Sequence, residues 1–199
     1  MTGVAEVIPI KKRPDSLTRL KASARKLFVE RGYHATRPQD IARDAGLGHG
    51  TFYLHYPDKR ACFLAFVDDA RQELNAFLAH ARTENMLEER IAATLNALYE
   101  YSDAHPGVLR AALTDKMVID AEGAQATPFL VSWAEEWANL VRDAAEKGET
   151  CKSYNPDIIG HAIAGALHQT GCEASRGQLC RKQMVDNLTR FLTKALKAN

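Results

Sequence analysis

The stretch TRPQDIARDAGLGHGTFYLHY, residues 36–56, constrains the fold of this 199-residue chain more than any other. Its pattern predicts two short helices, over 39–44 and 48–55, separated by a corner at Gly46. Glycine adopts the left-handed conformation that a sharp corner between helices requires. Two helices set crosswise at such a corner form a helix-turn-helix, whose second helix can lie in the major groove of DNA. We therefore expect the first residues of the second helix to face the base edges.

The charge of the chain is unevenly distributed. Residues 1–60 contain 12 Lys and Arg against 6 Asp and Glu, a net charge of +6. Residues 61–199 contain 14 against 19, a net charge of −5, so the whole chain carries only +1. A basic N-terminal third that coincides with a helix-turn-helix is typical of a DNA-binding head joined to a body with another task.

The rest of the chain also has helical periodicity. No segment alternates with the period of two that indicates a strand, so the predicted class is all-α with about nine helices. We expect a flexible basic arm over 1–14, a helix-turn-helix domain over 15–60 and a helical ligand-binding and dimerisation domain over 61–199. Besides the two helices already described, the predicted helices cover residues 17–31, 58–81, 87–104, 108–113, 128–147, 156–174 and 178–198.

Helix-capping residues support these boundaries. Asp15 or Ser16 can cap the helix over 17–31, and Asp58 can cap the one over 58–81. Thr36, with Gln39 three residues later, predicts a capping box. Lys59 lies in the first turn after Asp58, where backbone N–H groups favour anions, so this helix start is a candidate phosphate contact.

Other classes of protein find little support in the sequence. No apolar run approaches the roughly 18 residues of a membrane span, and the N-terminus lacks the layout of a signal peptide, so we expect a cytoplasmic protein that does not enter the membrane. The four cysteines form no CxxC pair, and no motif of a hydrolase, nucleotide-binding enzyme or metalloprotease occurs. His161, His168 and Cys172 share one helical face, but no further ligand accompanies them, so pocket or interface residues are the preferred interpretation. We expect no enzyme, no cofactor and no metal.

The last two predicted helices are candidates for self-association. The helix over 156–174 lacks a charged face, which is typical of a helix buried on more than one side, and its small residues would permit close approach. The final helix carries a broad apolar stripe. We expect a homodimer in which two helices from each subunit form a four-helix bundle, with an interface that includes Ile163, Leu167, Cys172, Leu188, Phe191 and Leu192.

The segments RKLFVERGYHAT (25–36) and DIARDAGLGHGTFYLHYPDKRACFLAF (40–66) resemble the N-terminal domain of the TetR family of bacterial transcriptional regulators. The agreeing positions include Gly32-Tyr33, Ala45-Gly46-Leu47 and Gly50-Thr51-Phe52-Tyr53. The resemblance covers about a third of the chain. It implies a homodimer that binds a palindromic operator on double-stranded DNA, usually represses, and is released by a small-molecule effector.

The resemblance also implies roles for single residues. His49 and Gly50 would face base edges, and the phosphate contacts would come from Thr36, Arg37, Thr51, Tyr53, His55 and Lys59. Two pairs of residues depart from the family pattern, Arg37-Pro38 before the first short helix and Gly48-His49 at the start of the second. A ligand-independent DNA-binding or architectural protein with the same head is the alternative function. Trp133 and Trp137 fit a core, yet they are also the first aromatic candidates for a pocket wall, and the complete candidate pocket consists of Tyr99, Met117, Leu130, Trp133, Trp137 and His168.

Overall fold

The computed structural model describes residues 15–79, 81, 86–114, 129–175 and 180–197. Every named element within these ranges is an α-helix, and the only pairing of extended backbone there is an isolated bridge between Thr150 and Lys197. The predicted all-α class is therefore confirmed. The predicted arm over 1–14 and the candidate pocket residue Met117 lie outside the described residues.

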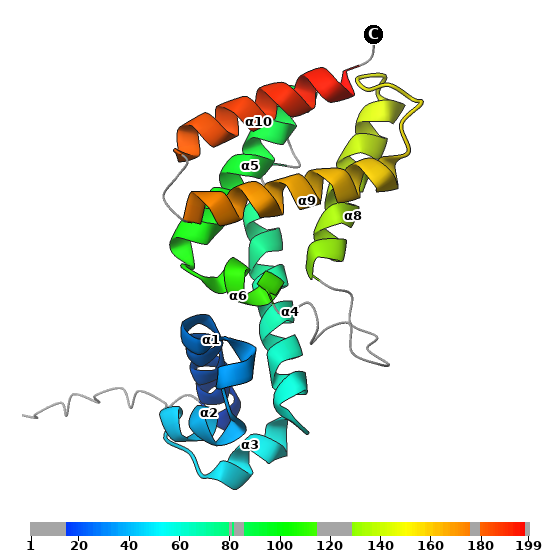
Figure 1. The fold of residues 1–199 in the computed structure, drawn as a ribbon. Helices are drawn as coiled ribbons and strands as arrows, with labels where there is room; N and C mark the ends of the chain where they lie inside the picture. The colour runs from blue at the N-terminus through cyan, green and yellow to red at the C-terminus, as the bar shows by residue number, and fades with distance from the viewer. Residues whose placement is uncertain (1–14, 80, 82–85, 115–128, 176–179, 198–199) are drawn as a thin grey trace, which may run out of the picture.

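Three helices form the head at one end of the molecule, α1 (Ser16–Ala35), α2 (Pro38–Asp44) and α3 (His49–His55). Helix α4 (Lys59–Leu78) runs from this head into the body, so the two parts share one continuous helix (Figure 1). The predicted division of the chain at residues 60 and 61 falls inside α4 and stays a prediction. The helices of the body are α5 (Leu87–Ala104), α6 (Val108–Thr114), α8 (Phe129–Glu146), α9 (Pro156–Ser175) and α10 (Arg181–Leu196).

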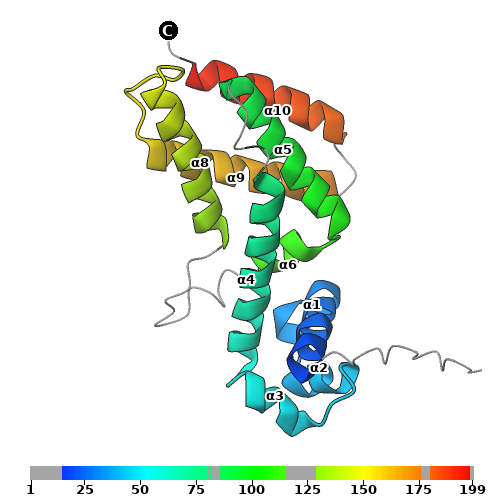
Figure 2. The same cartoon turned by 180° about the vertical axis from the view of Figure 1, so that it is seen from behind.

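Both views place α3 at the end of the molecule farthest from α10 (Figures 1 and 2). Between these ends, α6 packs against α1 and α4, α8 packs against α9, and α5 packs against α10. The head therefore packs mainly against the long α4 and the short α6.

Side-chain caps start two of the helices as predicted. Asp15 Oδ1 accepts the backbone N–H of Thr18 at 2.7 Å, and Asp58 Oδ1 accepts that of Ala61 at 2.7 Å. Each carboxylate satisfies a backbone donor that has no partner inside its helix. The expected capping box at Thr36 is wrong, because α2 begins after Arg37 and has no side-chain cap.

An aromatic cluster holds the head on α4. Phe28 of α1 meets Phe63 of α4 edge to face with ring centroids 5.1 Å apart, and Tyr33 lies 5.0 Å from the same Phe63 ring. Such pairs add stabilisation beyond the area that they bury. Ile41 of α2 and Phe52 of α3 are completely buried in the same core. The helix-turn-helix is thus anchored by apolar side chains that point away from its exposed surface.

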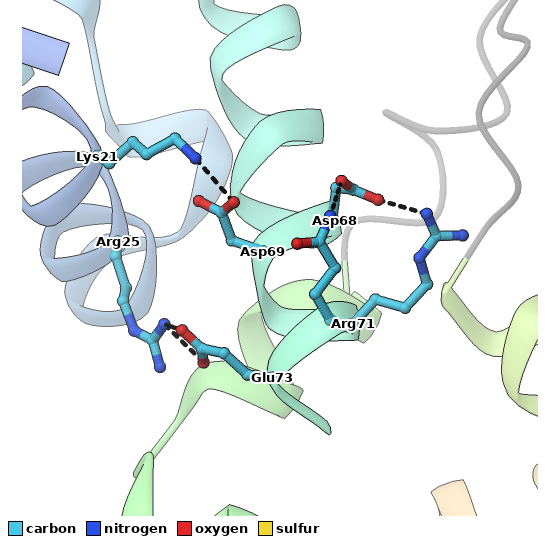
Figure 3. Close-up of polar contacts among 7 residues, drawn as sticks. Lys21, Arg25, Asp68, Asp69, Arg71 and Glu73 are labelled. Atoms are coloured by element: carbon cyan, nitrogen blue, oxygen red, sulfur yellow. Dashed lines mark hydrogen bonds and ion pairs between the residues drawn. The ribbon is translucent and has the colours of Figure 1, made fainter. Parts of the chain in front are cut away.

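Two ion pairs join α1 to α4 beside this cluster. Lys21 Nζ lies 2.8 Å from Asp69 Oδ1, and Arg25 Nη1 donates to both carboxylate oxygens of Glu73 at 2.6 and 2.8 Å (Figure 3). Tyr101 of α5 donates its hydroxyl to the same Glu73 carboxylate at 3.1 Å. Glu73 therefore connects the head, the long helix and the body.

Helices α8 and α9 cross at unusually short range. A Cβ atom added to Gly160 would lie 2.3 Å from the carbonyl oxygen of Ala134 and 2.8 Å from the backbone N of Ala138. Only a residue without a side chain allows this approach, so Gly160 sets the spacing of the two helices. In the described parts of the chain, no helix is long and apolar enough to span a bilayer.

Candidate nucleic-acid interface

The corner between α2 and α3 is built as the sequence predicts. Gly46 has a φ of +64°, the left-handed conformation, and Leu47 N–H donates to the carbonyl of Ala42 at 2.8 Å. This six-to-one hydrogen bond is the closing bond of a Schellman motif at a helix C-terminus. Arg19 of α1 supports the corner by donating to the carbonyl of Ala45 and, at 2.9 Å, to that of Gly46.

Helix α3 is fixed to the head by one face. Phe52 is fully buried, and Tyr56, directly after the helix, is 7% exposed. Burial raises the pKa of the Tyr56 hydroxyl to about 12, so this group stays neutral. At the far end, His55 Nε2 lies 2.8 Å from Ser16 Oγ at the start of α1, which limits rotation of the helix.

The opposite face of α3 is open to solvent. His49 and Gly50, the two residues that the resemblance assigns to base edges, are both exposed. The His49 ring meets the ring of Tyr53 one turn later, edge to face, with centroids 5.2 Å apart. Tyr53 itself is 50% exposed. The base-contact role of these residues stays a prediction, and their position allows it.

Thr36 does not have the position expected of a phosphate contact. Its side chain is fully buried, and its hydroxyl lies 2.8 Å from the carbonyl oxygen of Gly32 and 3.2 Å from that of Leu27. The hydroxyl hydrogen is therefore directed into the end of α1. The phosphate-contact assignment for Thr36 is wrong for this structure, because the group closes the corner between α1 and α2.

The other predicted phosphate contacts lie nearer the surface. Arg37 is exposed and Thr51 is half-buried. Lys59 donates to the carbonyl oxygen of Tyr33 at 3.0 Å, and its ammonium lies 4.1 Å from the centre of the Tyr33 ring. Contact with a phosphate would have to share or replace these interactions. These roles remain predictions.

Two residues of this interface were not singled out from the sequence. Arg19 closes the corner from a distant helix, and no local pattern reveals such a contact. Leu54 is 81% exposed on α3. The signal for Leu54 was present, because it follows Phe52 by two positions and so points away from the core face.

Some of the candidate pocket residues meet in one cavity of the body. Tyr99 of α5, Trp133 of α8 and His168 of α9 line a cavity of about 520 Å³, which α6 and α10 also border. Trp137 lines a separate cavity of about 200 Å³ together with Trp133. Leu130 packs against the core and is not a wall of either cavity.

Three predicted interface residues are buried within their own subunit. Ile163, Leu167 and Leu192 are only 4%, 3% and 6% exposed. Their side chains therefore cannot form the contact surface of a dimer, and that part of the assignment is wrong. Leu167 and Cys172 instead line the 520 Å³ cavity.

The exposed apolar residues of α9 and α10 are only partly those expected from the sequence. Phe191 is 64% exposed, as an interface residue requires, and Leu188 is partly buried. Ile158, 67% exposed, lies at the start of α9, and Ala162 and Ala166 are exposed further along the helix. The candidate dimer surface thus keeps Phe191 and Leu188 of the expected residues and adds Ile158, Ala162 and Ala166 of α9.

His168 and Cys172 lie close together, with Nε2 and Sγ 3.9 Å apart. Among the described residues, no group of three or more His, Cys, Asp or Glu side chains is arranged to hold a metal ion. We therefore treat this pair as part of the cavity wall.

Comparisons with known proteins agree with this arrangement. Residues 20–66 match the family described as "Bacterial regulatory proteins, tetR family". The HTH-type transcriptional regulator YuxN of Bacillus subtilis is 37% identical over 46 residues, which are 23% of this chain and 16% of YuxN. The chain thus spans well under two thirds of this relative. The Escherichia coli regulator UidR is 25% identical over 170 residues, which cover 83% of this chain and 84% of UidR.

Solved structures show the same fold over nearly the whole chain. The fatty acid degradation regulator FadR from Bacillus halodurans has a TM-score of 0.73 at 18% identity, covering 95% of this chain and all of FadR. TylP from Streptomyces fradiae has a TM-score of 0.70 at 21% identity, covering 92% of this chain and 87% of TylP. These proteins are regulators, in agreement with the expectation that the chain is not an enzyme. The helix-turn-helix and its match thus identify residues 20–66 as a domain of the tetR family of bacterial regulatory proteins, and the whole chain has the fold of solved regulators.

Proposed function

We propose that this chain is a transcriptional regulator that binds a palindromic operator as a homodimer, represses, and leaves the DNA when a small molecule binds its body. The observation that carries the proposal is the position of α3, whose Phe52 is buried in the head while its opposite face lies open at the tip of the molecule. That geometry suits a recognition helix in a major groove. Bacterial DNA lies in the cytoplasm, so we place the regulator there.

The effector would occupy the cavity lined by Tyr99, Trp133 and His168. Its volume of about 520 Å³ falls in the range typical of sites for small organic molecules. Its walls combine apolar and aromatic side chains with a few polar groups, as such sites usually do. We add no cofactor to this proposal.

One segment connects this cavity to the head. Ser102, Asp103 and Gly107, at the end of α5 and the start of α6, line the cavity. A Cβ atom on Gly107 would lie 2.8 Å from Val29 Cγ1 of α1, so the backbone here touches the head directly. Tyr101 in the same segment binds Glu73 of α4. An effector that displaces residues 102–107 would therefore press on α1, which supports effector control of the spacing between two heads.

The homodimer is proposed from the exposed apolar residues of α9 and α10. Phe191 and Ile158 are large side chains that remain in water in a single subunit, and a second copy could cover them. A dyad between two bodies would present two α3 helices to two half-sites of one operator.

Fluorescence anisotropy tests the function directly. The purified protein is titrated against DNA that flanks its own gene and against unrelated DNA at several salt concentrations. We expect a preference of roughly a thousandfold or more for the flanking DNA, the lower range for specific sites. Equal affinity for both DNAs, with a steep salt dependence, would contradict a local operator and favour an architectural role.

The effector is tested on the same complex. A panel of small organic compounds is added to the protein–DNA complex, and release is followed by anisotropy. A compound that releases wild-type protein should fail to release a variant in which Gly171→Leu fills the cavity, since Gly171 is a wall residue. Release of both proteins alike would place the effector elsewhere.

A further inference from the structure

Leu54 is the most exposed of the large apolar side chains in the described part of the chain, with 81% of its surface in contact with solvent. It lies on α3, which is anchored to the head by the buried Phe52 and by the buried Tyr56 directly after the helix. Transfer of such an apolar side chain out of water is favourable. Its exposure at the tip of the head therefore calls for an explanation in terms of what it contacts when the protein is bound.

The geometry of α3 gives Leu54 a definite direction. Successive residues of an α-helix are rotated by about 100°, so positions two before and two after Phe52 point away from the core. These positions are Gly50 and Leu54, four residues apart and therefore neighbours on one face. His49 and Tyr53 flank this face on one side, and Thr51 and His55 flank it on the other.

Gly50 makes the face unusually flat at its first turn. A Cβ atom at Gly50 would meet nothing within 4 Å, so the protein itself does not require a glycine at this position. Without a side chain at Gly50, the backbone of α3 can approach a surface closely, and Leu54 then projects one turn further along. The outward face thus has no side chain at Gly50 and a single exposed apolar side chain at Leu54.

We propose that Leu54 packs against the 5-methyl group of a thymine in the major groove and thereby selects that base. An aliphatic side chain offers no hydrogen bond to a base edge, so it can contribute to readout only by apolar contact. Among the four bases, thymine alone places an apolar group in the major groove. This inference rests on the proposed function, because it assumes that α3 enters that groove.

The surroundings of Leu54 argue against another role. The side chain is not part of the core of the head, and α3 lies at the opposite end of the molecule from the exposed Phe191 of α10. Contact with a second subunit through α9 and α10 would therefore leave Leu54 in water. DNA is the partner that the position of this helix favours.

The test begins with a preferred site obtained by in vitro selection from random duplex DNA with the purified full chain. Each thymine of that site is then replaced singly by deoxyuridine, which removes only the 5-methyl group. At one position in each half-site we expect Kd to rise about fourfold, the value of one buried methyl group. For Leu54→Ala, the same replacement should change Kd by less than about 1.5-fold, because the side chain that contacts the methyl group is gone.

Tyr53→Ala is the matched control. Tyr53 is the adjacent exposed residue, and its expected contact is with phosphate, so its loss should weaken binding to thymine and deoxyuridine sites alike and preserve the fourfold ratio. Both substitutions are at exposed positions, and circular dichroism verifies that each variant is folded.

The outcomes separate the inference from the function that it assumes. If selection enriches no sequence, the proposed function fails. If a site is enriched but no deoxyuridine replacement matters, or if the fourfold ratio survives in Leu54→Ala, the protein is a specific regulator and the role given to Leu54 is wrong.

Discussion

The close crossing of α8 and α9 predicts that Gly160→Ala destabilises the protein. The new Cβ would lie 2.3 Å from the carbonyl oxygen of Ala134 and 2.9 Å from the Cβ of Ala138. Ordinary contacts between such atoms begin near 3.4 Å, so α9 would have to move by about 1 Å. The atoms in contact belong to the backbone and to a methyl group, and neither can rotate away.

The magnitude follows from two opposing contributions. Overpacking of this kind costs about 1–3 kcal/mol or more. Replacement of glycine by alanine inside a helix contributes about 1 kcal/mol in the opposite direction. Since backbone atoms are involved, we expect the upper part of the first range to apply and the free energy of unfolding to fall by about 2 kcal/mol. For a chain of this length, that corresponds to a melting temperature lower by roughly 4–8 °C.

Gly165→Ala provides the control within the same helix. A Cβ at Gly165 would meet nothing within 4 Å, so only the gain in helix propensity remains and stability should rise by up to about 1 kcal/mol. Both variants are compared with wild type by urea denaturation at one protein concentration, because self-association would make stability depend on concentration. If Gly160→Ala proves as stable as Gly165→Ala, the tight crossing is refuted.

Three further changes test other contacts. Burial raises the pKa of Glu73, but its hydrogen bonds from Arg25 outweigh that effect and leave the pKa below 4.5. The stability that this pair contributes should therefore be present above pH 4.5 and disappear as the pH falls through the lowered pKa. Urea denaturation between pH 6 and 3 should therefore show a weaker pH dependence for Glu73→Gln than for wild type, and an identical dependence would contradict the pairing. Thr36→Val should lower stability by about 1–2 kcal/mol, because the carbonyl oxygens of Gly32 and Leu27 lose the hydroxyl that donates to them, while the folded variant binds DNA normally. Unchanged stability with lost DNA binding would restore its phosphate role. Phe191→Asp should give a folded monomer in analytical ultracentrifugation, and a surviving dimer would move the interface elsewhere.

The helices and the corner of the head could be predicted from sequence because their signals are local. Asp15 and Asp58 cap the helices that follow them, and Gly46 adopts the left-handed conformation that its place in the pattern requires. Each of these features depends on hydrogen bonds between residues at most five positions apart. Local hydrogen bonding and backbone sterics are sufficient to determine them.

Thr36 was misassigned because two local patterns compete there. Its spacing from Gln39 fits a capping box, and its position fits the phosphate contact implied by the resemblance. The hydroxyl instead turns back to the carbonyl of Gly32, whose positive φ ends the regular part of α1. Whether a hydroxyl points forward or backward depends on the angle between α1 and α2, which packing determines.

The residues of the body were predicted less well because helical periodicity identifies the apolar face of a helix but not the surface that covers it. The stripe that contains Ile163 and Leu167 is apolar, as expected, but it is covered by the same subunit. Tyr99, Trp133 and His168 meet in one cavity although they belong to three helices far apart in sequence. Only the tertiary fold decides which apolar stripe faces the core, a cavity or solvent.

The ion pairs between α1 and α4 reduce the charge that the head can offer to DNA. Lys21 and Arg25 pair with Asp69 and Glu73, two carboxylates outside residues 1–60 that the net charge of +6 does not include. Side chains in such ion pairs displace few counterions from a duplex. The slope of affinity against salt concentration reports only the phosphates whose counterions are displaced. The number of phosphates obtained from a salt titration should therefore be well below the formal excess of positive charge in the head.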